Sequence, residues 1–192
     1  MRCQLCESFS FSHICSPCKQ TFLTPKIYKR TILGNIQVIS FYKYDDIKSL
    51  LHTKHTDLGY YIYTILAELA FKKFADEFHF DEQIASIGID DRIKNGYAHT
   101  ALLNKALKSK NITPRYAKIL SNNDITYSGK SKEYRLEHPR EFTCKNFSEK
   151  NVILVDDIIT TGLTLTQACN TLTCKDKEVL FCLTLADAEL KK

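Results

Sequence analysis

The hydrophobic and polar positions of the chain follow two periods, one typical of buried strands and one typical of helices. Short apolar runs predict strands over 36–42, 84–89, 115–120, 152–155 and 179–185. Apolar residues at three- and four-residue spacing predict helices over 57–78, 101–108 and 164–172, the first capped by Asp57. Strands that alternate with helices, with near-continuous apolar runs, indicate an α/β fold in which helices flank both faces of a mostly parallel sheet.

Two regions depart from this alternation. Residues 1–25 are polar and rich in cysteine, and they end near Thr24-Pro25, so we expect a small module there and a second domain over 35–192. Residues 121–142 are polar and contain Asn122-Asn123-Asp124 and Ser128-Gly129, which predicts a long loop. The chain of 192 residues is long enough for one ordinary domain and a small appendage.

The composition narrows the class of protein. Hydrophobic residues make up 44% and charged residues 26%, as in a packed globular core, and no apolar run is long enough to span a bilayer. The first ten residues, MRCQLCESFS, contain no apolar segment of the kind found in signal peptides. We therefore expect a cytoplasmic protein without structural disulfides.

The positive charge is unevenly spread. The net charge is +5, and residues 92–118 carry seven basic side chains and no acidic one. Such a bias favours a polyanionic partner, which could be a phosphorylated ligand, a nucleic acid or an anionic membrane surface. The alternative is a solvated basic face with no partner.

Four N-terminal cysteines have the spacing of metal ligands. Cys3-x2-Cys6 and Cys15-x2-Cys18 form two CxxC pairs separated by eight residues. Two such pairs can supply four thiolates to one tetrahedral zinc, which would fold the segment and leave no open position for catalysis. The alternative is a pair of redox dithiols. Of the other cysteines, Cys169 and Cys182 lie in apolar runs and are expected to be buried thiols.

The stretch VILVDDIITTGLTL, residues 152–165, joins a strand to a helix through two carboxylates and a hydroxyl-rich turn. Ligands of parallel sheets bind beyond the carboxyl ends of the strands, where Asp156 and Asp157 follow VILV. The following helix N-terminus suits an anion, and Gly162 lets the backbone approach it without a Cβ. A phosphate is expected at residues 160–164, beside carboxylates that suit sugar hydroxyls or a bridging divalent cation. A phosphorylated sugar satisfies the whole arrangement; the alternative is a helix-capping turn behind two surface aspartates.

The same stretch resembles the motif with which type I phosphoribosyltransferases bind 5-phosphoribosyl-1-diphosphate (PRPP). Both consist of four apolar residues, two acids and a turn of threonine and glycine, whereas the GxxxxGK[ST] and GxGxxG loops are absent here. The resemblance implies that Asp156 and Asp157 hold the 2′- and 3′-hydroxyls of ribose and that magnesium binds with PRPP. It also implies a catalytic role for Asp157, as proton acceptor or electrostatic stabiliser. The 5′-phosphate would bind to Thr160, Thr161, Gly162, Leu163 and Thr164.

With its two CxxC pairs ahead of this motif, the chain also resembles the competence protein F (ComF) family of bacterial DNA-uptake proteins. Ile87–Ile89, Arg92 and Gly96-Tyr97 are similar to that family's diphosphate loop, whose form ends R-G-F-N-Q. This chain has Asn95, Ala98 and His99 in place of that Arg, Asn and Gln. The remaining candidates for binding the diphosphate are Arg92, Lys94 and Lys54.

The ComF resemblance implies a role in natural transformation. The protein would handle incoming single-stranded DNA at the cytoplasmic side of the inner membrane, together with other DNA-uptake proteins. Basic residues track phosphates and tyrosines stack on bases, so the candidate DNA contacts are Lys105, Lys108, Lys110 and Arg115. Two alternatives remain: an active phosphoribosyltransferase on an unknown acceptor, and a regulator that senses PRPP.

Overall fold

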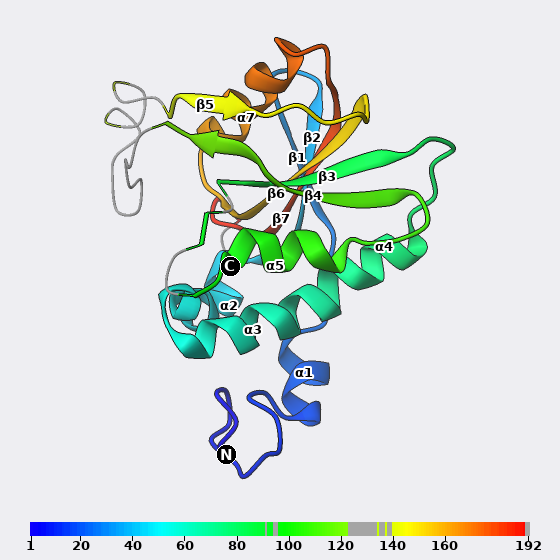
Figure 1. Cartoon of the computed structure of the whole chain (residues 1–192). Helices are drawn as coiled ribbons and strands as arrows, with labels where there is room; N and C mark the ends of the chain where they lie inside the picture. The colour runs from blue at the N-terminus through cyan, green and yellow to red at the C-terminus, as the bar shows by residue number, and fades with distance from the viewer. Residues whose placement is uncertain (91, 94–95, 123–133, 135–136, 138–139, 191–192) are drawn as a thin grey trace.

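The computed structural model describes residues 1–90, 92–93, 96–122, 134, 137 and 140–190 (Figure 1). Within them, seven strands form one sheet in the order β1-β2-β7-β6-β3-β4-β5. The strands from β2 to β4 in this order are parallel, and the outer strands β1 and β5 are antiparallel to their neighbours. The α/β fold with a mostly parallel sheet is thus confirmed, while Lys94 lies outside the described residues.

The predicted strands and helices are present, with four additions. The strands are β1 (Tyr28–Ile32), β2 (Ile36–Lys43), β3 (Ile84–Ile89), β4 (Ile112–Ser121), β5 (Phe142–Cys144), β6 (Asn151–Ile159) and β7 (Glu178–Asp187). The helices are α1 (Ser16–Phe22), α2 (Tyr44–Leu51), the 3-10 turn η1 (His52–His55), α3 (Asp57–Ala67), the π-turn η2 (Glu68–Lys72), α4 (Lys73–Glu77), α5 (His99–Ala106) and α7 (Leu163–Thr173). The pattern of apolar positions did not predict β1, β5, α1 or α2, and β1 falls between the two expected domains.

The long helix over 57–78 is an almost continuous helical segment made of α3, η2 and α4. Its N-cap is Thr56, whose hydroxyl accepts the N–H of Gly59 at 3.4 Å, so the expected cap at Asp57 is wrong by one residue. Asp57 is instead the first helical residue, where its negative charge favours the positive end of the helix dipole.

The sheet is covered on both faces, and the alternation of side chains along β6 shows how. Ile153 and Val155 belong to the core shared with α2, α3, α4 and α5, whereas Val152 and Leu154 belong to the core shared with α7. Figure 1 shows α7 on one side of the sheet and the longer helices on the other. Because successive residues of a strand point to opposite faces, the two aspartates that follow also point apart.

The carboxyl end of β6 lies where the order of the strands reverses. β3 pairs with β4 on one side and with β6 on the other, so the crossover connections on the two sides of the β3–β6 pair run in opposite directions along the sheet. Ligands of open α/β sheets bind in the crevice formed at such a point. The fold therefore places Asp156 and Asp157 at the edge where a ligand is expected.

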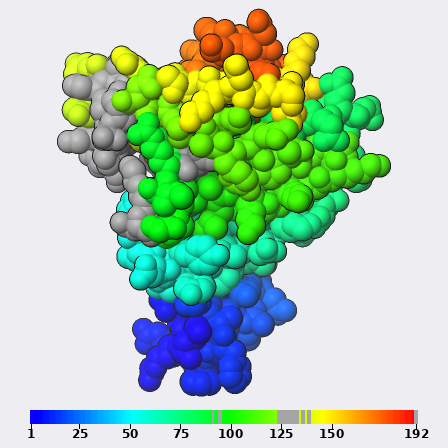
Figure 2. Space-filling view, viewed as in Figure 1, coloured from blue at the N-terminus to red at the C-terminus, as the bar shows by residue number. Residues whose placement is uncertain are grey.

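The N-terminal segment is a small lobe that packs against α3 (Figure 2). Cys3, Ile14, Cys18 and Leu23 are buried in the same core cluster as the α3 side chains. The ring of His13 stacks on Tyr61 at a centroid distance of 4.3 Å, which attaches the lobe to the helix surface. Among the described helices, none is both long and apolar enough to cross a membrane.

Candidate functional site

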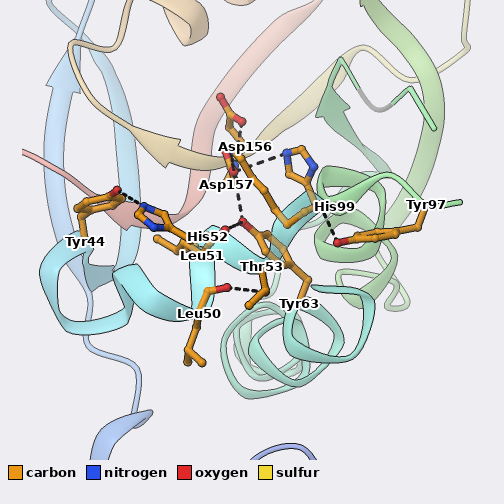
Figure 3. Close-up of polar contacts among 11 residues, drawn as sticks. Tyr44, Leu50, Leu51, His52, Thr53, Tyr63, Tyr97, His99, Asp156 and Asp157 are labelled. Atoms are coloured by element: carbon orange, nitrogen blue, oxygen red, sulfur yellow. Dashed lines mark hydrogen bonds and ion pairs between the residues drawn. The ribbon is translucent and has the colours of Figure 1, made fainter. Parts of the chain in front are cut away.

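Three side chains converge on one oxygen of Asp157 (Figure 3). Lys54 Nζ lies 2.9 Å from Asp157 Oδ2, the Tyr63 hydroxyl lies 3.3 Å from it, and His99 Nε2 lies 3.5 Å from it. They come from η1, α3 and α5, the elements that cover the face to which Asp157 points. All three contacts end on Oδ2, so none of them engages Oδ1.

This arrangement keeps Asp157 ionised. Burial alone would raise the pKa of its carboxyl, but the positive charge of Lys54, then His99, outweighs burial and holds the pKa well below its usual range. The carboxylate in turn raises the pKa of Lys54.

Asp156 has a different environment because it points to the other face. Its Oδ1 accepts the backbone N–H of Asp157 at 2.8 Å. Burial and the neighbouring negative charge of Asp157 raise the pKa of the Asp156 carboxyl, and the positive charge of Arg140 partly offsets this. In each aspartate these contacts engage one of the two carboxyl oxygens.

The turn over 160–164 leads directly from these carboxylates into α7. Gly162 is the N-cap, with φ of 78°, a conformation that residues with a Cβ rarely adopt. A Cβ on Gly162 would also lie 2.9 Å from the Ile32 side chain of β1. The first N–H groups of α7 have no partner within the helix, so the turn has the local geometry of an anion site.

Arg30 on β1 fixes the first peptide of this turn. Its guanidinium donates a hydrogen bond to the carbonyl of Thr160 and forms ion pairs with Asp187 (3.2 Å) and Glu189 (2.6 Å). A trans peptide directs its carbonyl and N–H to opposite sides, so this bond turns the Thr161 N–H away from β1. The donors of the turn are thereby oriented before any ligand binds.

A second contact fixes the loop that carries Lys54. The hydroxyl of Tyr97 lies 2.7 Å from the carbonyl of Lys54 and 3.2 Å from that of Thr56. This packing requires Gly59, because a Cβ there would lie 2.1 Å from the Tyr97 hydroxyl and 2.2 Å from the Thr53 carbonyl. Tyr97, Gly59 and η1 therefore form one unit that holds Lys54 against Asp157.

The segment after β3 brings further charged groups to the same edge. Asp90 has a positive φ of 49°, an unusual conformation for a residue with a side chain. Its carboxylate lies 3.5 Å from both Arg92 Nε and Arg140 Nη1, and Arg92 also donates to the carbonyl of Ser121 at the end of β4. Two of the three candidates for binding the diphosphate are thus placed: Lys54 contacts Asp157, and Arg92 contacts the end of β4.

The four candidate DNA contacts separate into two groups. Lys105, Lys108 and Lys110 are exposed along α5 and the turn that follows it. Arg115 instead forms an ion pair with Glu149, which raises the pKa of the guanidinium and lowers that of the carboxyl despite burial. The three lysines therefore present their charge to solvent, whereas Arg115 links β4 to the segment before β6.

The sequence patterns did not identify Arg30, Tyr63 or Arg140 as parts of this edge, whereas the resemblance had placed Tyr97 in the diphosphate loop. Arg30 and Tyr63 lie in segments far from residues 152–165 along the chain, and only the fold brings them near. His99 did carry a signal, since it stands where the resembled family has glutamine.

The N-terminal cysteines form a cluster that can hold a zinc ion. The sulfurs of Cys3, Cys6, Cys15 and Cys18 all lie within 4.8 Å of one another, and Cys6 and Cys15 are 3.7 Å apart. Four sulfurs at about 2.3 Å from a tetrahedral zinc would be separated by roughly 3.8 Å. Burial opposes ionisation of Cys3, but the backbone N–H groups of Cys15, Cys6 and Leu5 outweigh it and lower the pKa of this thiol to about 6. The donor set therefore fits zinc, while His13 is engaged with Tyr61.

We expect the double substitution Cys3→Ser, Cys6→Ser to remove zinc and to loosen residues 1–25, because two ligands cannot complete the tetrahedral site. Elemental analysis of the purified protein gives the zinc content, and limited proteolysis reports the loosening. Cys174→Ser changes an exposed cysteine outside the cluster and is the matched control. One zinc per chain in the double variant would contradict the assignment.

We expect Gly59→Ala to lower the free energy of unfolding by about 1–3 kcal/mol, the usual cost of overpacking. Helix propensity alone predicts the opposite effect on stability, because alanine is more favourable than glycine in a helix by about 1 kcal/mol. Urea denaturation measures the difference. Ser49→Ala, at an exposed position of helix α2, is the control. A Gly59→Ala protein at least as stable as wild type would show that η1 does not depend on this contact.

Three solved structures resemble the chain at low identity. A hypoxanthine phosphoribosyltransferase from Staphylococcus aureus is 15% identical over 68% of this chain and 67% of its own, with a TM-score of 0.40. The enzyme of the same name from Trypanosoma cruzi is 16% identical over 68% and 72%, with a TM-score of 0.42. An orotate phosphoribosyltransferase from Aeropyrum pernix is 16% identical over 89% and 80%, with a TM-score of 0.41.

A search among curated protein sequences finds no match. The model of the phosphoribosyltransferase-like family PRTase-CE matches residues 24–190, which is nearly all of the chain that follows the cysteine cluster and includes both carboxylates and the turn. The chain belongs to the PRTase-CE family.

Proposed function

We propose that the protein binds PRPP at the carboxyl end of β6 and uses it as a phosphoribosyl donor. The observation that carries the proposal is the adjacent pair Asp156 and Asp157 at the end of β6, each with one carboxyl oxygen engaged by the protein, followed directly by the turn at Gly162. Adjacent ribose hydroxyls match the second oxygens, and the 5′-phosphate matches the turn at Gly162.

The cations around this edge support a ligand with several negative charges. Lys54 and His99 lie at Asp157, Arg140 lies near Asp156, and Arg92 lies beside the end of β4. Magnesium bound with PRPP would reduce the negative charge of the diphosphate and help it to leave. In transfer, an acceptor attacks C1′ as diphosphate departs, and the ionised Asp157 stabilises the positive charge that develops on the ribose.

We expect Asp156→Ala to weaken PRPP binding by about 10- to 100-fold, because a ribose hydroxyl left without its acceptor in a buried site costs about 1–3 kcal/mol. Isothermal calorimetry with PRPP and magnesium measures the affinity, and circular dichroism verifies the fold. Glu68→Ala, at an exposed acid on the long helix, is the control. Normal PRPP affinity in the Asp156→Ala protein would refute the site.

Single-stranded DNA binding is a second candidate function, and with it the natural-transformation role that the ComF resemblance implies. The observation in its favour is the row of exposed lysines at positions 105, 108 and 110, which runs along α5 away from His99. A basic row of this kind can follow a phosphate backbone, and any sequence preference should be weak. Partners at the inner membrane belong to the same proposal.

We expect the wild-type chain to bind an oligonucleotide at about 50 mM salt and to lose affinity steeply as salt rises, because counterions are released. Changing the three lysines to glutamine should weaken binding and reduce the salt slope. Fluorescence anisotropy measures both quantities. Replacing Lys73, an exposed lysine of α4, supplies the control. No binding at low salt would rule out this second function.

A further inference from the structure

An apolar cavity of about 440 Å³ lies between α5 and the edge of the sheet. Its walls include Ala98, the N-cap of α5, with Ala101 of α5 and Leu120 of β4, and the side chains of Tyr97 and Tyr116 also line it. This volume is within the range of small-ligand sites, roughly 300–1,000 Å³. The cavity is separate from the carboxylates, although Ala98 immediately precedes His99 in the chain.

The β4 side of the cavity is built from an irregular strand. Ile87 of β3 pairs with Arg115, but Ile89 pairs with Ile119, so β4 accommodates extra residues between these positions. Within this bulge Ala117 has a positive φ of 51°, a strained conformation for alanine. Bulges on strands re-aim side chains and are common beside functional sites. Here the bulge places Tyr116 and Ala117 in the cavity wall.

The charged residues around the cavity indicate which class of ligand it can bind. Arg92 and Lys105 belong to its lining, Lys105 is exposed, and the segment from residue 92 to 118 contains no acidic side chain in its sequence. Tyrosine rings bind planar groups by stacking. Apolar walls do not accommodate a strongly hydrated group. The lining therefore suits a flat aromatic ring that carries a negative group at one end.

We propose that this cavity binds a nucleotide, with the nucleobase between the apolar walls and tyrosine rings and a phosphate at Lys105. The proposal goes beyond PRPP binding and does not require it. Tyr97 connects the two sites, because its ring lines the cavity while its hydroxyl holds the loop of Lys54, the partner of Asp157. Occupancy of the cavity therefore biases the position of Lys54, and each ligand changes the affinity of the other by the same factor.

The test uses adenosine 3′-monophosphate, which has a base and a phosphate but no 5′-phosphate for the turn at Gly162. The full-length protein should bind it in calorimetry, and ribose 5-phosphate should not displace it. Ala101→Phe, which fills the cavity, should weaken binding about tenfold or more, as expected when base stacking is lost. Lys73→Gln, at an exposed lysine of α4 outside the lining, should leave binding unchanged.

Tyr116→Ala tests the same wall if Ala101→Phe does not fold, because Tyr116 is 47% exposed and contributes little to the core. Tyr97→Phe keeps the ring and removes the hydroxyl, so nucleotide binding should persist while its effect on PRPP affinity disappears. Absence of nucleotide binding in the wild type, unchanged binding in the cavity variants, or displacement by ribose 5-phosphate would overturn the proposal.

Two further results identify the source of the nucleotide and separate the proposals. An oligonucleotide that binds at least as tightly as the mononucleotide and loses affinity in Ala101→Phe would show that the cavity binds a base of a single strand. An oligonucleotide whose affinity is unchanged in Ala101→Phe would show that the cavity binds a free nucleotide. Asp156→Ala should retain nucleotide binding. A wild-type chain that binds the nucleotide but not PRPP would refute the proposed function and leave this inference standing.

Discussion

The buried carboxylate of Asp157 is the constraint around which the site is organised. An ionised carboxylate in this position is costly unless it is paired, and Lys54, Tyr63 and His99 supply the pairing from three different elements. Each of these elements must then keep a fixed position on one face of the sheet. The backbone around Gly59 and Tyr97 follows from that requirement, because it holds η1 where Lys54 reaches the carboxylate.

The turn over 160–164 is held by contacts with β1, the strand at one edge of the sheet. β1 is a short edge strand, yet it supplies both Arg30, which orients the Thr160 peptide, and Ile32, which packs beneath Gly162. Arg30 is itself held by Asp187, which is buried at the end of β7. The turn is therefore oriented by contacts between segments that are distant in the chain, and its donors need little rearrangement to meet an anion.

Much of this site could be predicted from the sequence, but the supporting contacts could not. Strand β6, the two aspartates and the start of α7 are local features, so apolar runs and turn residues were sufficient to place them. Strand β1 carries no continuous apolar run and forms through pairing with β2, so its pattern gave no strand signal. Arg30 and Tyr63 then acquire their roles from contacts across the fold, which spacing along the chain does not encode. The exact start of a helix was also not predicted, since Thr56 is the N-cap of α3, whereas the sequence had indicated Asp57.

The alternation of a β-strand explains why two adjacent aspartates behave differently. Asp157 points to the face covered by α3 and α5, where cations hold its pKa low, while Asp156 points to the α7 face, where burial and its negative neighbour raise its pKa. If both carboxylates shared one face, they would compete for the same cations and repel each other more strongly. Because the two carboxyl groups lie on opposite faces, Asp157 remains charged, while Arg140 only partly offsets the raised pKa of Asp156.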